Sequence, residues 1–239
     1  MPAADAPCPE QAFNATALKW HTCAWLLLPV LVFLAGWMHW YAALPLMFLT
    51  AAGLAPRKRK EPQTRDSLPA FPLFTRSSFL ALAAFAALMT LSGWGEWVNQ
   101  HPDHIVRNAC LRELVASPWP VIFPDGNMLV YNTGFWLIPA LAGKLAGLDA
   151  ARVLVVLWGA WGLFLAWLWL CVFSGRRSLL LALLMAAFGS LLNFQCWLGL
   201  DLFRLHYFGT AEQIMCSANA SIPVLLFFIF LASGRIDRK

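Results

Sequence analysis

Residues 153–173 read VLVVLWGAWGLFLAWLWLCVF, a run of 21 residues that contains no charged side chain. At 1.5 Å per helical residue this run is about 31 Å long, close to the ~30 Å hydrocarbon core of a bilayer. The basic turn Gly175-Arg176-Arg177 follows it, and residues 178–200 are again mostly apolar. The two runs predict a pair of transmembrane helices joined by a short cytoplasmic loop.

The composition of the whole chain agrees with these runs. Of 239 residues, 60% are hydrophobic and 12% charged, against roughly 45–50% and 25% in soluble domains. This excludes a soluble globule and a disordered chain, and six cysteines are too sparse for a disulfide-stapled miniprotein. Lys and Arg flank the apolar runs, so the net charge of +5 does not indicate a nucleic-acid partner. We expect an all-α, polytopic helical membrane protein.

The other apolar runs bring the prediction to about six transmembrane helices. Residues 24–55 are interrupted by Pro29, Pro45 and an aromatic cluster at 39–41, so we expect a short hairpin that turns at the membrane interface. Further spans are predicted at 78–97 and 217–233. The chain then divides into an N-terminal tail and hairpin (1–56), a basic cytoplasmic loop (57–77) and a transmembrane core (78–239) with an extracytoplasmic loop at 98–152.

Residues 129–147 leave two topologies open, because this segment could either span the membrane or lie in its outer interface. In the interfacial topology eleven Lys and Arg fall on the cytoplasmic side and five outside, whereas a spanning segment gives nine against seven. Cytoplasmic loops carry an excess of Lys and Arg, which favours the interfacial topology. It places both termini in the cytoplasm.

This topology collects polar groups on the outer side. Seven of the twelve acids fall there, with three of the five histidines: Glu96, Asp103, Glu113, Asp125, Asp149, Asp201, Glu212, His101, His104 and His206. Polar density between apolar spans is unfavourable unless it lines a wet or protein-walled space, so it marks the expected working face.

Residues 98–128 are too long for a structureless connection, and we expect a helix there. Apolar side chains between Ile105 and Val115 recur at three- and four-residue spacing, which indicates an interfacial helix with Arg107 and Arg112 exposed. Asp103, which precedes this helix, is either its N-cap or a functional carboxylate.

Several short segments, in this order, resemble the first half of bacterial GT-C glycosyltransferases. They are QHPDH at 100–104, RN at 107–108, WPV at 119–121, YNTGFWLIPA at 131–140, GKL at 143–145, LGLD at 198–201 and NASIP at 219–223. The resemblance covers the chain from about Ser78 onward and depends on order and topology. Members commonly run to about twice this length, so we expect the chain to correspond to an N-terminal half.

The resemblance implies an enzyme of the bacterial cytoplasmic (inner) membrane that transfers a sugar from a polyprenyl-phosphate carrier to an acceptor on the extracytoplasmic side. An acidic residue of the first large outer loop and one of the next outer loop act in such enzymes, and Asp103 and Asp201 fit these positions. We expect Asp103 to be the base that accepts the proton of the acceptor, a role best served by an unpaired, partly buried carboxylate.

Other outer residues are candidate substrate-binding groups. Lys144 and Arg152 could meet the lipid phosphate at headgroup depth, with ordinary interfacial snorkelling as the alternative. Tyr131 is either a binding residue or a member of the aromatic belt. The remaining candidates for substrate binding are His104, Arg107 and His206.

No cofactor is required by these patterns, although a divalent metal held by His104, His206, Asp103 and Asp201 is an alternative. A second functional class is a non-catalytic scaffold or lipid-carrier-binding subunit, with a membrane partner subunit. A small-solute transporter is less favoured, since no charge lies mid-span and no inverted repeat of spans is evident.

Overall fold

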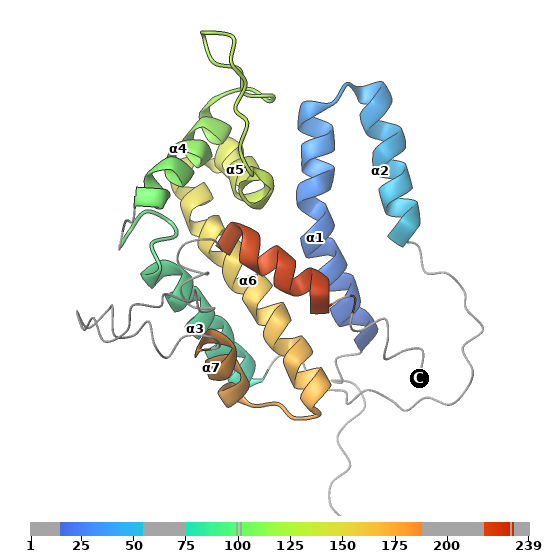
Figure 1. The fold of residues 1–239 in the computed structure, drawn as a ribbon, viewed down its shortest axis with the longest axis vertical. Helices are drawn as coiled ribbons and strands as arrows, with labels where there is room; N and C mark the ends of the chain where they lie inside the picture. Colours follow the sequence, from blue (N-terminus) through green and yellow to red (C-terminus); the bar gives the residue numbers. More distant parts are fainter. Residues whose placement is uncertain are drawn as a thin grey trace, which may run out of the picture.

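The computed structural model describes residues 15–54, 75–98, 100, 102–187, 218–229 and 231, and this part of the chain is all-helical (Figure 1). The helices are α1 (Ala15–Trp37), α2 (Trp40–Leu54), α3 (Arg76–Leu91), α4 (Pro102–Ala116), α5 (Gly134–Ala146), α6 (Leu148–Ser174), α7 (Leu179–Ala187) and an unlabelled helix at Ala218–Ile229, drawn red in Figure 1. We refer to the last as the 218–229 helix.

Helix α6 forms the centre of the fold. It contacts α1, α3, α4, α5 and α7, and 15 of its 27 residues are buried. Trp167 and Trp169 have no exposed surface. Gly159 and Gly162 allow close packing, because the Sδ atom of Met89 lies 2.9 Å from where a Cβ of Gly159 would be, and Cγ2 of Ile222 lies 2.5 Å from that of Gly162.

The α1–α2 hairpin is anchored to α6 by tryptophans. The indole N–H of Trp25 donates to the carbonyl of Trp158 at 3.1 Å, and the two rings stack with centroids 4.9 Å apart. Further along the two helices, the indole N–H of Trp169 in α6 donates to Oγ1 of Thr22 in α1 at 3.0 Å. These bonds satisfy indole donors inside an apolar bundle, where an unpaired donor would be unfavourable.

The described parts of the predicted spans are apolar helices, but most of these helices are shorter than predicted. Among the described helices, α1 and α6 are long and apolar enough to cross a membrane. Helix α3 ends at Leu91 and not near Trp97, so the predicted span at 78–97 is wrong in length: its 16 residues reach about 24 Å. The count of six spans therefore stays a prediction.

Three further predictions concern the later segments. Within 129–147 the helix α5 has 13 residues, about 20 Å, and carries Pro139. The run 178–200 begins with α7, and its residues beyond Ala187 lie outside the described residues. Residues 217–233 contain the 218–229 helix, which packs beside α6 and α1 (Figure 1).

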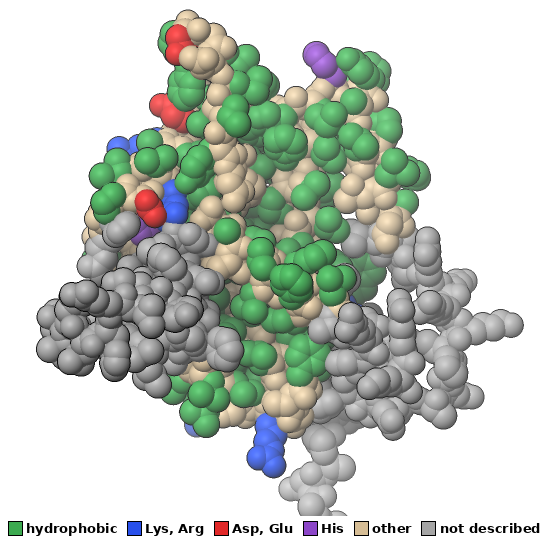
Figure 2. Space-filling view, viewed as in Figure 1, with side chains coloured by type: hydrophobic (Ala, Val, Ile, Leu, Met, Phe, Trp, Pro, Cys, Tyr) green, Lys and Arg blue, Asp and Glu red, His purple; other side chains and the backbone are tan. Residues whose placement is uncertain are grey.

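The fold separates two ends. The α1–α2 turn, residues 102–133, α5 and the start of α6 gather at one end, to which the turn 92–98 is joined through Glu96, while α3 begins and α6 finishes at the other (Figure 1). We call the first the polar end, because five of the seven acids predicted to face outward lie there: Glu96, Asp103, Glu113, Asp125 and Asp149. Figure 2 shows acidic side chains at this end beside extensive hydrophobic surface.

Candidate functional site

A glycine-rich turn follows α3 and connects it to the polar end. Ser92 ends the helix, and Gly93 and Gly95 adopt positive φ angles of 92° and 90° that suit glycine. Glu96 follows with a φ of 68°, an uncommon angle for a residue with a side chain. The turn buries Trp94, and it directs the Glu96 carboxylate toward α4 and α6.

The Glu96 carboxylate joins two arginines from different helices. Arg112 of α4 donates through Nη2 at 2.6 Å and through Nε at 3.2 Å, and Arg152 of α6 donates through Nη2 at 2.5 Å. Arg152 also donates to Asp149 at 2.8 Å. Only 8% of the Glu96 side chain is exposed, so this carboxylate is the centre of a partly buried charge cluster.

The protonation of Glu96 follows from these contacts. Burial alone raises the pKa of the carboxyl, but hydrogen bonds and charge interactions with Arg112 and Arg152 outweigh it and hold the pKa below its ordinary value. The hydrogen bond to Glu96 and its negative charge in turn raise the pKa of Arg112. The cluster is therefore ionised at neutral pH and ties the turn to α4 and α6.

A second group of polar residues lies at the start of α4. Asp103 is in the first turn, and Arg107, one turn on, brings Nη2 to 3.6 Å from the Asp103 carboxylate. The Arg107 guanidinium lies over the Trp94 ring, 5.7 Å from its centroid, and His104 meets the same ring edge-on at 5.5 Å. Trp94 thus supports both His104 and Arg107, which are 1% and 7% exposed.

These positions correct three predictions. Arg107 is buried and not exposed, because the Trp94 ring offers its guanidinium a packing surface, while Ile105 and Val106 are 66% and 56% exposed. Asp103 is not the N-cap, since α4 begins at Pro102. The Asp103 carboxylate is also not unpaired, because it forms an ion pair with Arg107, while its side chain is partly buried, with 54% exposed.

Arg107 keeps unused hydrogen-bonding capacity. Its Nε and Nη1 atoms are buried and find no acceptor among the described residues, and the 3.6 Å contact to Asp103 exceeds hydrogen-bond length. A buried guanidinium that is incompletely paired is unfavourable. Arg107 is therefore held by its packing on the Trp94 ring and by its charge interaction with Asp103.

The other predicted binding residues lie in separate places. Lys144, near the end of α5, donates to the carbonyls of Ser117 at 2.5 Å and Val115 at 3.5 Å, and its ammonium lies 5.0 Å from the Trp119 ring centroid. It therefore satisfies carbonyls at the end of α4. Tyr131 is 41% exposed and packs against Trp136, with centroids 5.8 Å apart.

The predicted pair of aspartates is not tested. Asp201 and His206 lie outside the described residues, so the structure gives neither their distance from Asp103 nor a complete metal ligand set. Within the part of the chain that the structure does describe, there is no group of three or more His, Cys, Asp or Glu side chains that could hold a metal ion.

Two cavities lie away from Asp103. One, of about 580 Å³, lies between α1, α2 and the 218–229 helix. The other, of about 350 Å³, lies between α1, the start of α5, α6 and the 218–229 helix. Neither cavity is lined by Asp103, His104 or Arg107.

Sequence reasoning missed the roles of Trp94 and Glu96. Glu96 entered only as one of seven outer acids, and its link to Arg152 joins residues 56 positions apart. A signal was present in the stretch SGWGEW at 92–97, where two glycines around an aromatic residue are typical of a tight, packed turn.

Comparisons with protein-family models, with curated proteins and with solved structures gave no match for this chain.

Proposed function

We propose that the chain is a multi-pass protein of the bacterial inner membrane, with both termini in the cytoplasm and the polar end outside. In support, α1 and α6 have the length and apolarity of membrane spans. Large apolar side chains are also exposed along α2 and the 218–229 helix, as with Phe48 at 72% and Phe228 at 64%. Lipid is a solvent in which such surfaces are stable.

We further propose that the polar end takes part in transfer of a sugar from a polyprenyl-phosphate carrier to an acceptor, as in GT-C glycosyltransferases. Asp103 accepts the proton of the acceptor hydroxyl as its oxygen attacks the anomeric carbon. The bond from that carbon to the phosphate oxygen breaks, and its electrons leave with the phosphate. The exposed face of Asp103 permits access by an acceptor.

The observation that carries this proposal is the incompletely paired Arg107 beside an exposed Asp103. Guanidinium groups bind phosphate oxygens through charge-assisted hydrogen bonds. The departing phosphate needs cationic stabilisation, and Arg107 supplies it one helical turn from the proposed base. Asp201 is proposed as the second acidic residue, and His206 as a further binding group.

The test compares Asp103→Asn and Asp201→Asn with the wild-type chain in proteoliposomes that contain polyprenyl-phosphate-linked hexoses. Asp125→Asn is the matched control, because Asp125 lies at the same end of the fold, is exposed and bonds to Asn127 within a turn. Loss of general-base catalysis lowers a rate by about 10²–10⁴-fold. Wild-type turnover that neither Asp103→Asn nor Asp201→Asn reduces would remove the catalytic assignment.

The second candidate is a non-catalytic scaffold or lipid-carrier-binding subunit, alone or with a membrane partner subunit. Three cations of the polar end favour this candidate, because each already donates hydrogen bonds to protein oxygens: Arg112, Arg152 and Lys144. Under this proposal the chain binds polyprenyl monophosphate in vesicles, Arg107→Met weakens that binding, and no sugar is released. Vesicle binding measured beside turnover separates the two functions.

A further inference from the structure

The end of the fold opposite the polar end carries cations and, among the described residues, no acid. It is formed by the start of α3 and by the turn between α6 and α7, which bring Arg76, Arg176 and Arg177 to this end (Figure 1). The acids of the described residues all lie at the polar end, and so do the ion pairs between described residues. We call this part of the molecule the basic end, and Figure 2 shows basic side chains there.

The two segments of the basic end are held against each other. Arg177 of the α6–α7 turn donates to the hydroxyl of Ser78 in the first turn of α3, and its guanidinium lies over the Trp167 ring, 5.5 Å from the centroid. Helix α3 also contacts α7. Arg76 lies two residues before Ser78 and Arg176 directly before Arg177, so both belong to the joined segments. Their side chains are exposed, and neither has an ion pair within the described part of the chain.

Arg76 stands at the start of an exposed apolar stripe on α3. Phe79 and Leu80 follow it by three and four residues and therefore lie on the same helix face. They are 61% and 59% exposed. The start of α7 also exposes leucines, which are Leu180, Leu183 and Leu184. A cation beside a strip of apolar surface matches a phospholipid, whose phosphate lies next to its acyl chains.

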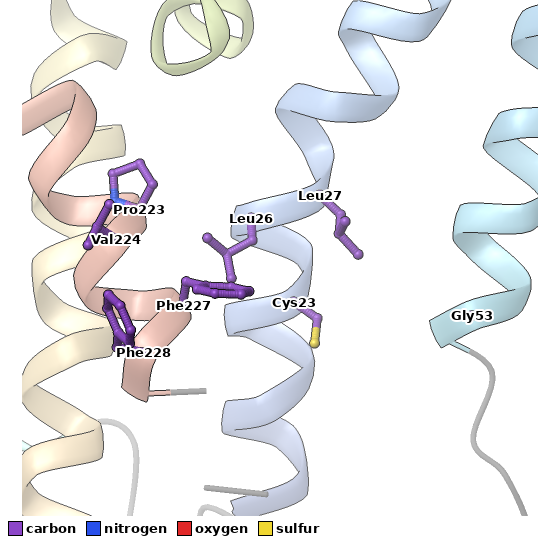
Figure 3. Close-up of a pocket in the computed structure, with 8 residues that line it drawn as sticks. All are labelled: Cys23, Leu26, Leu27, Gly53, Pro223, Val224, Phe227 and Phe228. Atoms are coloured by element: carbon purple, nitrogen blue, oxygen red, sulfur yellow. The ribbon is translucent and has the colours of Figure 1, made fainter. Parts of the chain in front are cut away.

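The apolar groove of about 580 Å³ between α1, α2 and the 218–229 helix lacks this combination. Figure 3 shows the side chains that line it, and none of them is charged: Cys23, Leu26, Leu27, Gly53, Pro223, Val224, Phe227 and Phe228. Nothing in that groove distinguishes one lipid headgroup from another. The basic end does, because its arginines select by charge.

The sign of the charge determines which lipid the basic end favours. An anionic phospholipid brings phosphate oxygens, which guanidinium groups bind through charge-assisted hydrogen bonds. A zwitterionic lipid also brings a cation, which the arginines repel. A free phosphate ion gains nothing from the apolar stripe. Basic groups between transmembrane helices on the cytoplasmic side are typical of sites for anionic headgroups.

We propose that the basic end binds an anionic phospholipid, with its headgroup at Arg76 and Arg176 and an acyl chain along the α3 stripe of Phe79 and Leu80. Arg177 holds the turn that carries Arg176 against α3. The site goes beyond the proposed transferase function, since it involves neither Asp103 nor Arg107. Its location in the cytoplasmic leaflet rests on the proposed orientation of the chain.

The test measures binding of dioleoyl-phosphatidylglycerol and dioleoyl-phosphatidylcholine to the purified full chain by native mass spectrometry. One Lys or Arg near an anionic lipid contributes about a factor of five, so two arginines predict roughly 25-fold tighter binding of phosphatidylglycerol. Equal affinity for the two lipids would overturn the proposal. Inorganic phosphate should not displace phosphatidylglycerol at equal concentration, and displacement would show a site for free anions instead.

Variants locate the preference. Arg76→Gln and Arg176→Gln should each reduce it to about fivefold, and the double variant should abolish it. Arg112→Gln is the matched control, because it removes the same charge from a side chain that is 56% exposed at the polar end. It should keep the roughly 25-fold preference, and an equal loss in Arg112→Gln would show that net charge, not this site, is responsible. Leu80→Gln should weaken both lipids and keep their ratio; unchanged affinities would contradict the placement of the acyl chain.

The outcomes stay interpretable if one variant is unstable. Arg76→Gln and Arg176→Gln are read separately, and an unchanged preference in either folded variant contradicts the site. The binding assay in detergent involves neither sugar transfer nor a membrane orientation. Failure here is therefore a separate result from failure of the transferase proposal or of the proposed topology.

Discussion

Replacing Glu96 by Gln tests whether the charge cluster holds the polar end together. Gln has the same length and must adopt the same positive φ, so the backbone strain is nearly unchanged and the substitution removes mainly charge. The Arg152 end of the cluster is 24% exposed and the Arg112 end 56%. We therefore expect most of the loss from the bond to Arg152.

The expected loss of stability in Glu96→Gln follows from the bonds of Glu96 to Arg152 and to Arg112. A hydrogen bond to a charged group contributes about 1.5–3 kcal/mol when buried, and an exposed ion pair about 0–1 kcal/mol. Because the Gln oxygen still accepts one bond, we expect a net loss of about 2 kcal/mol. For a chain of this size that corresponds to a fall of roughly 4–8 °C in Tm.

The assay is thermal unfolding of the detergent-solubilised protein followed by tryptophan fluorescence. Asp149→Asn is the control: it removes a carboxylate that is 92% exposed and bonded to the same arginine, and it should change the free energy of unfolding by less than about 0.5 kcal/mol. A Tm for Glu96→Gln equal to that of the wild type, with Asp149→Asn also silent, would refute the structural role of the cluster.

The pH dependence gives an independent check on the same residue. The pKa of Glu96 is lower in the folded protein than its ordinary value of 4.5, so its contribution is present above that pH and lost as the pH falls through the folded pKa. The difference in stability between wild type and Glu96→Gln should therefore be constant at neutral pH and shrink below about pH 4.5. A difference that does not change with pH would show that packing, not charge, is responsible.

Two further predictions concern packing and topology. Gly143→Ala should destabilise the protein by about 1–3 kcal/mol, because the new Cβ would lie 2.5 Å from Cγ2 of Val115. Gly53→Ala, whose Cβ would have no atom of the described residues within 4 Å, should leave Tm unchanged or slightly higher in the same melt. In intact spheroplasts, Val130→Cys should react with an impermeant maleimide above the wild-type background and Arg176→Cys should not; the reverse pattern would invert the proposed orientation.

The parts of the fold that could be predicted are those set by local sequence. The run at 153–173 lies within α6, because a continuous apolar stretch leaves the backbone no better way to satisfy its hydrogen bonds in an apolar surrounding. The end of α3 was missed since hydropathy does not distinguish a helix from a turn rich in glycine and tryptophan. Ser92–Trp97 is apolar enough to look like the end of a span.

The candidate site shows the same division between local and long-range information. The spacing of apolar residues between Ile105 and Val115 predicts helix α4, although the structure begins this helix at Pro102 and so puts Asp103 inside its first turn, one turn before Arg107. The burial of Arg107 could not be deduced, because it depends on Trp94, which arrives from another element. The bond from Arg152 to Glu96 likewise requires the tertiary fold.

The cations of the polar end differ in the donors that they have left. Lys144 satisfies carbonyls of the segment after α4, and Arg112 and Arg152 share Glu96. Their bonds to protein oxygens fix where these three side chains lie, although the Nε atom of Arg152 is buried without an acceptor among the described residues. Arg107 already lies beside the exposed Asp103 and has two guanidinium nitrogens without an acceptor among the described residues. Arg107 is therefore the cation of the polar end whose replacement by methionine tests the proposed phosphate contact most directly.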